Sequence, residues 1–230
     1  MTKIDNFKFT GELKSMSKNY KDVFNFFMLE NALLTEHGLP VIRGTDYIPT
    51  NLIPFNYAMT SKNFKHGIHF YIDDYQFERV WNKPQIYTEL LKKFDCVIAP
   101  DFSLYKNFPK PLQIYNLYRQ RILTAYWQKQ GITVIPNLTW SDKDSLNYAL
   151  EGMPKHSVIA LSTNGCLKNK QVKQEFLECF NKAMQYLMPI KILIIGKVPE
   201  ELNSYKNIIK FNSYSNHFEK LHKGDIINGR

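Results

Sequence analysis

The chain has 230 residues, of which 44% are hydrophobic and 14% are aromatic. Such a length and composition suit one large folded domain and exclude wholesale disorder, because there is ample apolar material for a buried core. Thirty basic residues against 21 acidic ones give a formal net charge of +9, which favours contact with polyanions such as nucleic acid or phosphorylated ligands.

The sequence indicates no targeting or membrane segment. Its longest purely apolar runs hold about five residues, whereas a membrane helix requires roughly 20. Three cysteines, Cys96, Cys166 and Cys179, match no zinc-site spacing and cannot all pair within one chain. We therefore expect a protein of the reducing cytoplasm that makes no membrane contact.

Residues 1–39 form the first predicted unit. Apolar residues between Val23 and Leu34 recur at a spacing compatible with a short helix. Gly38 suits the C-terminal cap of that helix, and Pro40 lies just beyond it. We expect an N-terminal arm that packs on a main domain at 40–198, which is followed by a final βα element and basic tail at 199–230.

From residue 41 onward, short β-branched runs alternate with stretches of helical spacing. Continuous apolar runs are typical of strands covered on both faces, and their alternation with helices indicates parallel βα units. The predicted strands are 41–42, 68–72, 96–99, 133–135, 157–161, 191–195 and, more weakly, 208–211. The predicted helices are 76–95, 111–130, 143–150 and 168–188.

Two α/β architectures satisfy this order of elements. The first is a barrel-like parallel sheet, including an incomplete TIM-type barrel, and the second is a doubly wound open sheet. Residues 97–103 and 134–140 echo one another, since each strand ends in proline followed by Asp or Asn. Because repeated strand ends hint at repeated units, we favour the barrel-like arrangement.

Carboxylates follow three of the predicted strands, at Asp46, Asp74 and Asp101. In either architecture, the carboxyl ends of parallel strands carry the functional loops. We expect these three residues to be catalytic, either as acid and base or, for Asp74 and Asp101, as ligands of Mg²⁺ or Mn²⁺. Asp also caps helices, and Asp142 suits that role.

Other polar residues follow the later strands and are candidates for substrate binding. These are Asn137, Trp140, Ser162, Asn164 and Lys168. Residues 162–165 form a small polar turn before a helix, which can cradle a phosphate group. Lys168 opens a lysine cluster that can attract an anionic substrate or simply form a solvated face.

The segment from Lys106 to Gly131 is basic and aromatic, with no acidic residue. Arg119 and Arg121 in this segment are candidates for phosphate contact, because arginine among aromatic rings can bind single strands. The aromatic residues also fit the core face of a helix, which leaves a structural interpretation open. His66 and His69 are expected to be ordinary structural histidines.

Several stretches together resemble one family, domain of unknown function 4417. They are residues 44–49, 67–81, 100–105, 113–121 and 160–165, and the run Asp-Asp-Tyr-Gln-Phe-Glu-Arg at 73–79 is the most specific. The resemblance spans roughly residues 38–196. The family occurs in bacteria, their phages and mobile elements and has no assigned activity, so the resemblance implies a setting rather than a mechanism.

Two classes of function follow from these observations. The first is a metal-assisted enzyme that acts on a nucleotide, nucleic acid or other phosphorylated substrate at the acidic strand ends. The alternative is a non-catalytic module that binds nucleic acid or a host protein, and that supports replication or interferes with a host system. In a phage setting, the expected location is the host cytoplasm.

Overall fold

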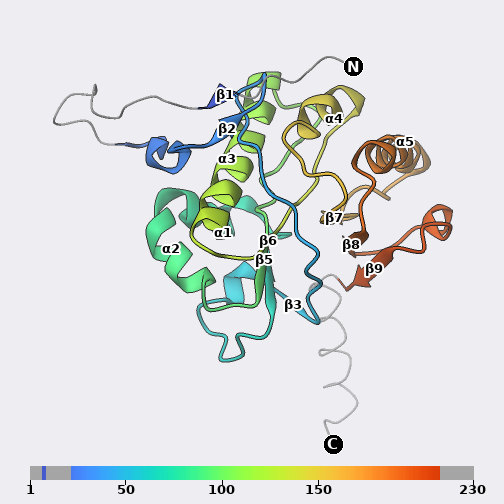
Figure 1. Ribbon diagram of the computed structural model, residues 1–230. Helices are drawn as coiled ribbons and strands as arrows, with labels where there is room; N and C mark the ends of the chain where they lie inside the picture. Colours follow the sequence, from blue (N-terminus) through green and yellow to red (C-terminus); the bar gives the residue numbers. More distant parts are fainter. Residues whose placement is uncertain (1–6, 9–21, 213–230) are drawn as a thin grey trace, which may run out of the picture.

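The computed structural model describes residues 7–8 and 22–212, and residues 1–6, 9–21 and 213–230 lie outside the described part (Figure 1). The strands are β1 (Phe7–Lys8), β2 (Leu33–Leu34), β3 (Leu52–Pro54), β4 (Gly67–His69), β5 (Cys96–Ile98), β6 (Val134–Ile135), β7 (Val158–Ser162), β8 (Lys191–Ile195) and β9 (Ile208–Phe211). The α-helices are α1 (Asp74–Asn82), α2 (Pro84–Leu91), α3 (Lys110–Lys129), α4 (Lys143–Ala149) and α5 (Lys170–Leu187). Short 3₁₀ helices are η2 (Phe26–Leu29), η3 (Phe55–Tyr57) and η4 (Glu200–Leu202).

The predicted N-terminal helix is wrong. Its residues instead form η2 and then β2, which pairs antiparallel with β1. Asn25 and Asn31 have positive φ values of 57° and 60°, and this backbone conformation is incompatible with a continuous helix. Met28 and Leu29 are nevertheless buried in the main core, so this segment packs on the rest of the protein.

Two parallel sheets form the centre of the protein, which confirms the predicted α/β class. One has the order β3-β4-β5-β6 and the other β7-β8-β9, so neighbouring strands follow one another along the chain. The described strands therefore show no reversal of order of the kind that defines a doubly wound sheet. Backbone hydrogen bonds from Ala160 to Pro136 and from Leu138 to Ala160 connect β6 to β7.

One face of both sheets shares a single apolar cluster. Ile98 of β5, Ala160 of β7 and Leu193 of β8 lie in it, and Leu52 of β3 and Phe211 of β9 pack against it. Strands from both sheets thus face a common interior, as in a barrel. No pairing joins β3 to β9 in the described part of the chain, so a closed barrel is not formed.

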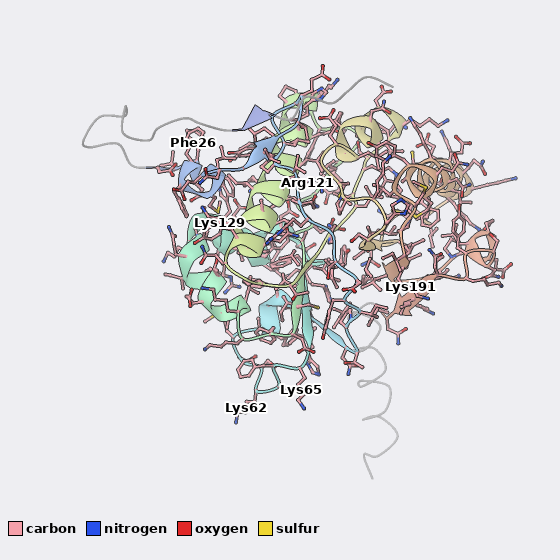
Figure 2. The ribbon with its side chains drawn as sticks, in the orientation of Figure 1. Phe26, Lys62, Lys65, Arg121, Lys129 and Lys191 are labelled. Atoms are coloured by element: carbon pink, nitrogen blue, oxygen red, sulfur yellow. The ribbon has the colours of Figure 1, made fainter. Side chains whose placement is uncertain are left out.

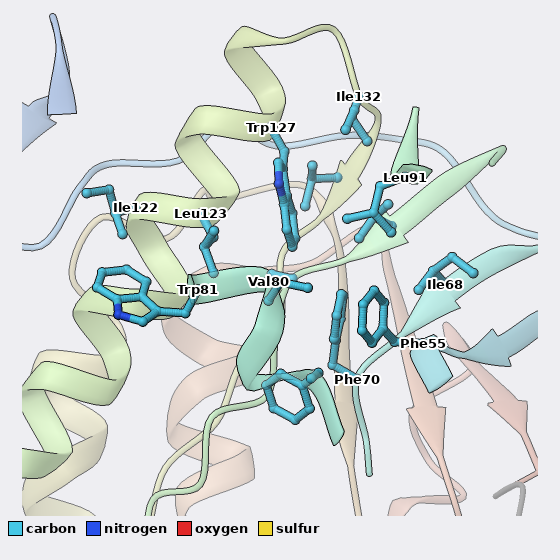
Figure 3. Packing of buried hydrophobic residues seen from close by; sticks show 14 of the residues in the cluster. Phe55, Ile68, Phe70, Val80, Trp81, Leu91, Ile122, Leu123, Trp127 and Ile132 are labelled. Carbon is cyan, nitrogen blue, oxygen red and sulfur yellow. The ribbon is translucent and has the colours of Figure 1, made fainter. Parts of the chain in front are cut away.

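Helices cover the opposite face of each sheet, which explains the continuous apolar runs of the strands. Helices α1, α2 and α3 pack on the four-stranded sheet, and α4 and α5 pack on β7 and β8 (Figure 1). Figure 3 shows the first of these layers, where the Phe70 ring stacks between Phe55 and Trp127 at centroid distances of 5.0 and 5.8 Å. Trp127 is fully buried.

The predicted helix at 76–95 is interrupted. Pro84 begins α2, and Lys83 before it has φ −140° and ψ 60°, outside the helical region. Proline lacks a backbone N–H and disfavours the α conformation of the preceding residue, so α1 ends at Asn82.

Two strand predictions also differ from the structure. Residues 41–42 form no strand, while β3 at Leu52–Pro54 was not predicted. No helix within 22–212 is long and apolar enough to cross a membrane.

Candidate functional site at the strand ends

Three side chains meet where β4, β5 and β6 end. The Tyr71 hydroxyl donates a hydrogen bond to Oδ1 of Asn137 over 2.9 Å. Nδ2 of Asn137 in turn donates to Oδ1 of Asp101 over 2.9 Å and to the Pro100 carbonyl over 3.3 Å. The structure therefore brings two of the predicted site residues, Asp101 and Asn137, into direct contact.

The Asp101 carboxyl group has a shifted pKa. The pKa of Asp101 is raised from 3.8 to about 6, mainly by burial and to a smaller extent by the nearby Asp74 carboxylate. Hydrogen bonds to the Asn137 and Thr139 side chains act in the opposite direction, because they stabilise the charged form. A carboxyl group with a pKa near 6 is suited to proton transfer close to neutral pH.

Asn137 has a different role from the predicted contact with substrate. Its side chain is fully buried, and its carbonyl oxygen and amide group both have partners within the protein. No part of this amide is exposed to receive a substrate. Asn137 instead orients the Asp101 carboxyl group.

Asp74, the first residue of α1, lies beside this group. Its carboxylate accepts hydrogen bonds from the backbone N–H and the hydroxyl of Ser103, the latter over 2.8 Å. Asp74 therefore joins the start of α1 to the loop after β5 and does not cap its own helix. Asp142, by contrast, caps α4 through the backbone N–H of Ser145, as predicted.

His69 and Tyr71 extend the site into the sheet interior. The two rings stack at 5.6 Å, and Nδ1 of His69 accepts a hydrogen bond from the Tyr71 backbone N–H. Burial lowers the pKa of His69 to about 4, so its ring is neutral at pH 7. The structural interpretation of His69 agrees with this geometry. Tyr71 was not predicted as a site residue, although its two-residue spacing from His69 places both on one face of an extended chain.

The loop after β7 forms the next part of the rim. The Ser162 hydroxyl donates to the Ile195 carbonyl over 3.2 Å and accepts from the Asn164 backbone N–H. Asn164 and Lys168 are exposed. Cys166 lies close enough to both Asp101 and Lys168 for their charges to act on its pKa, although burial has the largest effect and raises it to about 11.

Asp46 does not belong to this site, which corrects the prediction. The Thr45 carbonyl accepts a hydrogen bond from the Val158 backbone N–H, at the first residue of β7. The neighbouring Tyr47 hydroxyl donates to Asp95, which immediately precedes β5. Asp46 is exposed at this amino end of the strands, because residues 41–42 do not form the strand that was expected to carry it.

Arg119 is buried, and the structure therefore does not support its predicted contact with substrate. Its guanidinium group donates to both carboxylate oxygens of Glu78, over 2.7 and 2.9 Å, and to Asn116. It also lies 3.9 Å from the centre of the Phe102 ring. Asn116 donates to the Ser103 carbonyl, so this network supports the loop that binds Asp74.

Arg121 is also buried. Its side chain is not exposed to solvent and therefore cannot contact a phosphate group. Its guanidinium group donates to the Ala149 carbonyl at the end of α4 and to the sulfur of Met153. Figure 2 shows Arg121 inside the molecule, whereas Lys62 and Lys65 project from a distant loop. Burial lowers the pKa of Arg121 to about 9.

Trp140 is occupied by a packing contact. Its ring stacks on Phe176 of α5 at a centroid distance of 5.5 Å and an angle of 16°. The side chain is partly exposed, so it retains a face at the edge of the α4–α5 layer.

A cavity of about 380 Å³ lies between the starts of α3 and α4. Lys110, Asp142, Tyr148 and Glu151 contribute to its lining, and Asp101 does not. The strand-end site is thus separate from this cavity.

The described residues contain no group of three or more His, Cys, Asp or Glu side chains placed to hold a metal ion. A metal ion bound at Asp74 and Asp101 would therefore have two carboxylates of the described residues as ligands. Mg²⁺ often takes one or two carboxylates together with substrate phosphates, so such a pair fits a metal that arrives with its substrate.

Comparison with known proteins identifies the family. The chain is 32% identical to the Gene 1 protein of Mycobacterium phage L5 over 181 residues, which are 77% of this chain and 78% of that protein. It is 31% identical to the Gene 1 protein of Mycobacterium phage D29 over 168 residues, 70% of this chain and 61% of that protein. No solved structure matches. Residues 32–214 match the model of a domain of unknown function, DUF4417, and the chain belongs to this family.

Proposed function

We propose that the protein is an enzyme that acts on a phosphorylated substrate, with Asp101 as the general acid or base. The observation that carries this proposal is the Asp101 carboxyl group, oriented by Asn137 and given a pKa of about 6 by burial. A catalytic acid or base works best when its pKa lies near the working pH. Perturbed carboxyl groups at the carboxyl ends of parallel strands are typical of active sites.

The charge around the rim supports an anionic substrate. Lys168 and Lys170 follow β7, Lys197 follows β8, and all three are exposed. None of these three lysines has a carboxylate partner among the ion pairs of the described residues. The positive charge of these lysines attracts a phosphate group toward the partly buried Asp101 carboxyl group, which remains the acid or base.

A barrel-like arrangement of the strands would place the strand-end loops around one site. In that arrangement the strands follow one another around the interior that contains Ile98, Ala160 and Leu193, with β3 and β9 as its open edges. The loops after β4 to β8 then form one mouth, and the partly exposed Asp101 lies within it.

Mg²⁺ or Mn²⁺ bound by Asp74 and Asp101 is a second candidate chemistry. It is favoured by the electrostatic coupling of the two carboxyl groups, since Asp74 raises the pKa of Asp101. A divalent cation would remove this repulsion and bind a substrate phosphate at the same place. The similarity to two mycobacteriophage proteins supports a role in a phage or mobile element, within the host cytoplasm.

The test is a turnover screen of nucleotides, sugar phosphates and short nucleic acids, each with and without Mg²⁺ or Mn²⁺. Wild type is compared with Asp101→Asn, and Asp46→Asn is the matched control because Asp46 is an exposed carboxylate at the opposite strand ends. We expect turnover in wild type and the control and a loss of at least about 100-fold in Asp101→Asn.

Melting curves separate the two chemistries. A metal ion bound by the native protein raises the melting temperature through mass action. If metal stabilises wild type and not Asp74→Asn, the metal chemistry is supported. Turnover without metal supports Asp101 as acid or base. Turnover that survives Asp101→Asn contradicts both.

A further inference from the structure

The Thr163 hydroxyl, directly after β7, lacks the partner that a buried polar group normally has. The side chain is 3% exposed, and its Oγ1 atom has no hydrogen-bond partner among the described residues. The buried hydroxyls of Thr88 and Thr124, by contrast, each donate to a backbone carbonyl over 2.7 Å. Buried polar groups are nearly always paired, so this hydroxyl points to a partner that the chain itself does not supply.

The Thr163 hydroxyl is directed toward Gly196, the residue after β8. A Cβ atom on Gly196 would lie 2.6 Å from Oγ1 of Thr163 and 3.1 Å from Oδ1 of Asn164. The two loops are joined at this point, because the Ile195 carbonyl accepts from the Thr163 backbone N–H and from the Ser162 hydroxyl, both over 3.2 Å. Glycine therefore leaves a position between the loops that has no side chain and is bordered by an unpaired hydroxyl.

Lysines border this position from both loops. In the loop after β7, Cε of Lys168 would lie 3.8 Å from a Cβ atom on Gly165. In the loop after β8, Lys197 directly follows Gly196. Both lysines are exposed, and neither forms an ion pair in the described part of the chain. Unpaired ammonium groups next to an unpaired hydroxyl favour an anionic ligand.

Carboxylates of the neighbouring segments leave this positive charge in place. Glu201 of η4 is paired with Lys173 over 2.7 Å, and Glu175 of α5 is paired with Lys106 over 3.2 Å. Glu200 is exposed and forms no ion pair within residues 22–212, so it opposes one of the lysines. The unpaired lysines of the two loops outnumber it.

The same loop lies beside the Asp101 carboxyl group. The charges of Asp101 and Lys168 both act on the pKa of Cys166, which Asp101 raises and Lys168 lowers. A ligand whose anionic group lies at the loop after β7 therefore extends to Asp101 over a short distance.

We propose that Thr163, Lys168, Gly196 and Lys197 form a binding site for the phosphate group of a phosphate monoester. One phosphate oxygen accepts a hydrogen bond from the Thr163 hydroxyl at the position that Gly196 leaves free, and the two ammonium groups bind the other oxygens. The inference rests on the proposed function in one respect, since it names a phosphate monoester as the substrate class of the Asp101 site.

Isothermal titration calorimetry on the full chain measures binding of inorganic phosphate and of glycerol phosphate, with glycerol as the uncharged probe. Valine has the shape of threonine without the hydroxyl, so Thr163→Val removes the donor and keeps the packing. We expect both phosphates to bind wild type and their affinity to fall by roughly 10- to 100-fold in Thr163→Val, the effect of losing one hydrogen bond to a charged group. Thr124→Val is the matched control, because that buried hydroxyl already has a partner, and it should bind as wild type does.

The lysines are tested as a pair. Lys168→Gln combined with Lys197→Gln should lower phosphate affinity by roughly 2- to 25-fold, since each exposed ammonium group makes a modest contribution. Lys62→Gln combined with Lys65→Gln removes the same charge from a distant loop and should leave affinity unchanged (Figure 2). Melting curves give a second measurement, in which phosphate should stabilise wild type more than Thr163→Val. The general stabilising effect of phosphate on folded proteins acts equally on both.

Absence of phosphate binding, or an affinity that Thr163→Val leaves unchanged, would overturn the inference. Equal binding of glycerol and glycerol phosphate would also overturn it. These failures are distinct from failure of the proposed function. If wild type turns over a phosphorylated compound in an Asp101-dependent manner and Thr163→Val leaves the KM unchanged, only the phosphate site is wrong. If phosphate binds through Thr163 and nothing is turned over, the phosphate site stands and the catalytic role of Asp101 is wrong.

Discussion

Asn137 holds Asp101 through a hydrogen bond of 2.9 Å from Nδ2 to Oδ1. The other end of the same amide accepts from Tyr71, so each half of the Asn137 side chain has a fixed partner. An amide that is satisfied at both ends cannot rotate without leaving a buried polar group unpaired. The position of the Asp101 carboxyl group is therefore set by residues that follow two neighbouring strands, β4 and β6.

Replacement of Asp101 should change how stability depends on pH. Because its folded-state pKa of about 6 exceeds the ordinary value of 3.8, the folded chain binds this proton more tightly than the unfolded chain. The stability that this group contributes is fully present below about pH 3.8 and is lost as pH rises through 6. In Asp101→Asn this loss disappears, so the free energy of unfolding of the variant minus that of wild type should rise by on the order of 2 kcal/mol across this range.

Urea denaturation of both proteins at several pH values between 3.8 and 8 measures this difference. Asp46→Asn is the control, because it removes an exposed carboxylate at the opposite end of the strands. A difference between Asp101→Asn and wild type that stays flat with pH would show that Asp101 titrates normally.

Loss of the Tyr71 hydroxyl should destabilise the fold. In Tyr71→Phe, Oδ1 of the fully buried Asn137 loses its donor, which should lower the free energy of unfolding by about 1–3 kcal/mol. Tyr47→Phe is a matched change, since its hydroxyl donates to Asp95 at the surface, and it should cost less than about 1 kcal/mol. Chemical denaturation compares the two, and equal losses would mean that the Asn137 amide finds another donor.

Arg121 should tolerate an apolar residue of similar length. Its guanidinium group lies in the core without a carboxylate in its described hydrogen bonds, and burial disfavours its charge. Arg121→Met keeps much of the volume and removes that cost, so stability should stay within about 1 kcal/mol of wild type. Arg121→Ala leaves a cavity and should cost about 2–5 kcal/mol. A severe loss in Arg121→Met, seen by denaturation, would instead assign the charge an essential role.

Thr163→Val should stabilise the protein. The Thr163 hydroxyl is buried and has no hydrogen-bond partner in the described structure, and valine has the same shape without the polar atom. Removing an unsatisfied buried hydroxyl should raise the free energy of unfolding by about 1 kcal/mol. Thr124→Val is the control, because that buried hydroxyl donates to the Gln120 carbonyl over 2.7 Å and its loss should not stabilise. Thermal melts of both variants decide the sign.

The strand ends were the most predictable part of the site. Asp101 and Asn137 each follow a proline that ends an apolar run, and this local pattern survives folding because parallel strands align their carboxyl ends. The strand expected before Asp46 does not form, because a run of two apolar residues is too short to define a strand. Strand β3 was missed for a related reason, since its three residues include Pro54 and carry no periodic pattern.

The two arginines show a limit of a different kind. Charged side chains are rarely buried, so a basic residue on a predicted helix is normally assigned to the surface. Arg119 is buried because Glu78, 41 positions earlier, supplies its counter-ion, and Arg121 because the end of α4 supplies a carbonyl. Neither partner is visible in the spacing of the α3 sequence.

The sequence by itself determined the α/β class, the family, most strands and helices, and the location of polar residues at strand ends. These features depend on local runs of apolar residues and on turn chemistry, which act over a few positions. The tertiary structure alone decided which side chains meet. The contacts of Asn137 join residues 36 and 66 positions apart, and such contacts follow from the order and register of strands that no local pattern encodes.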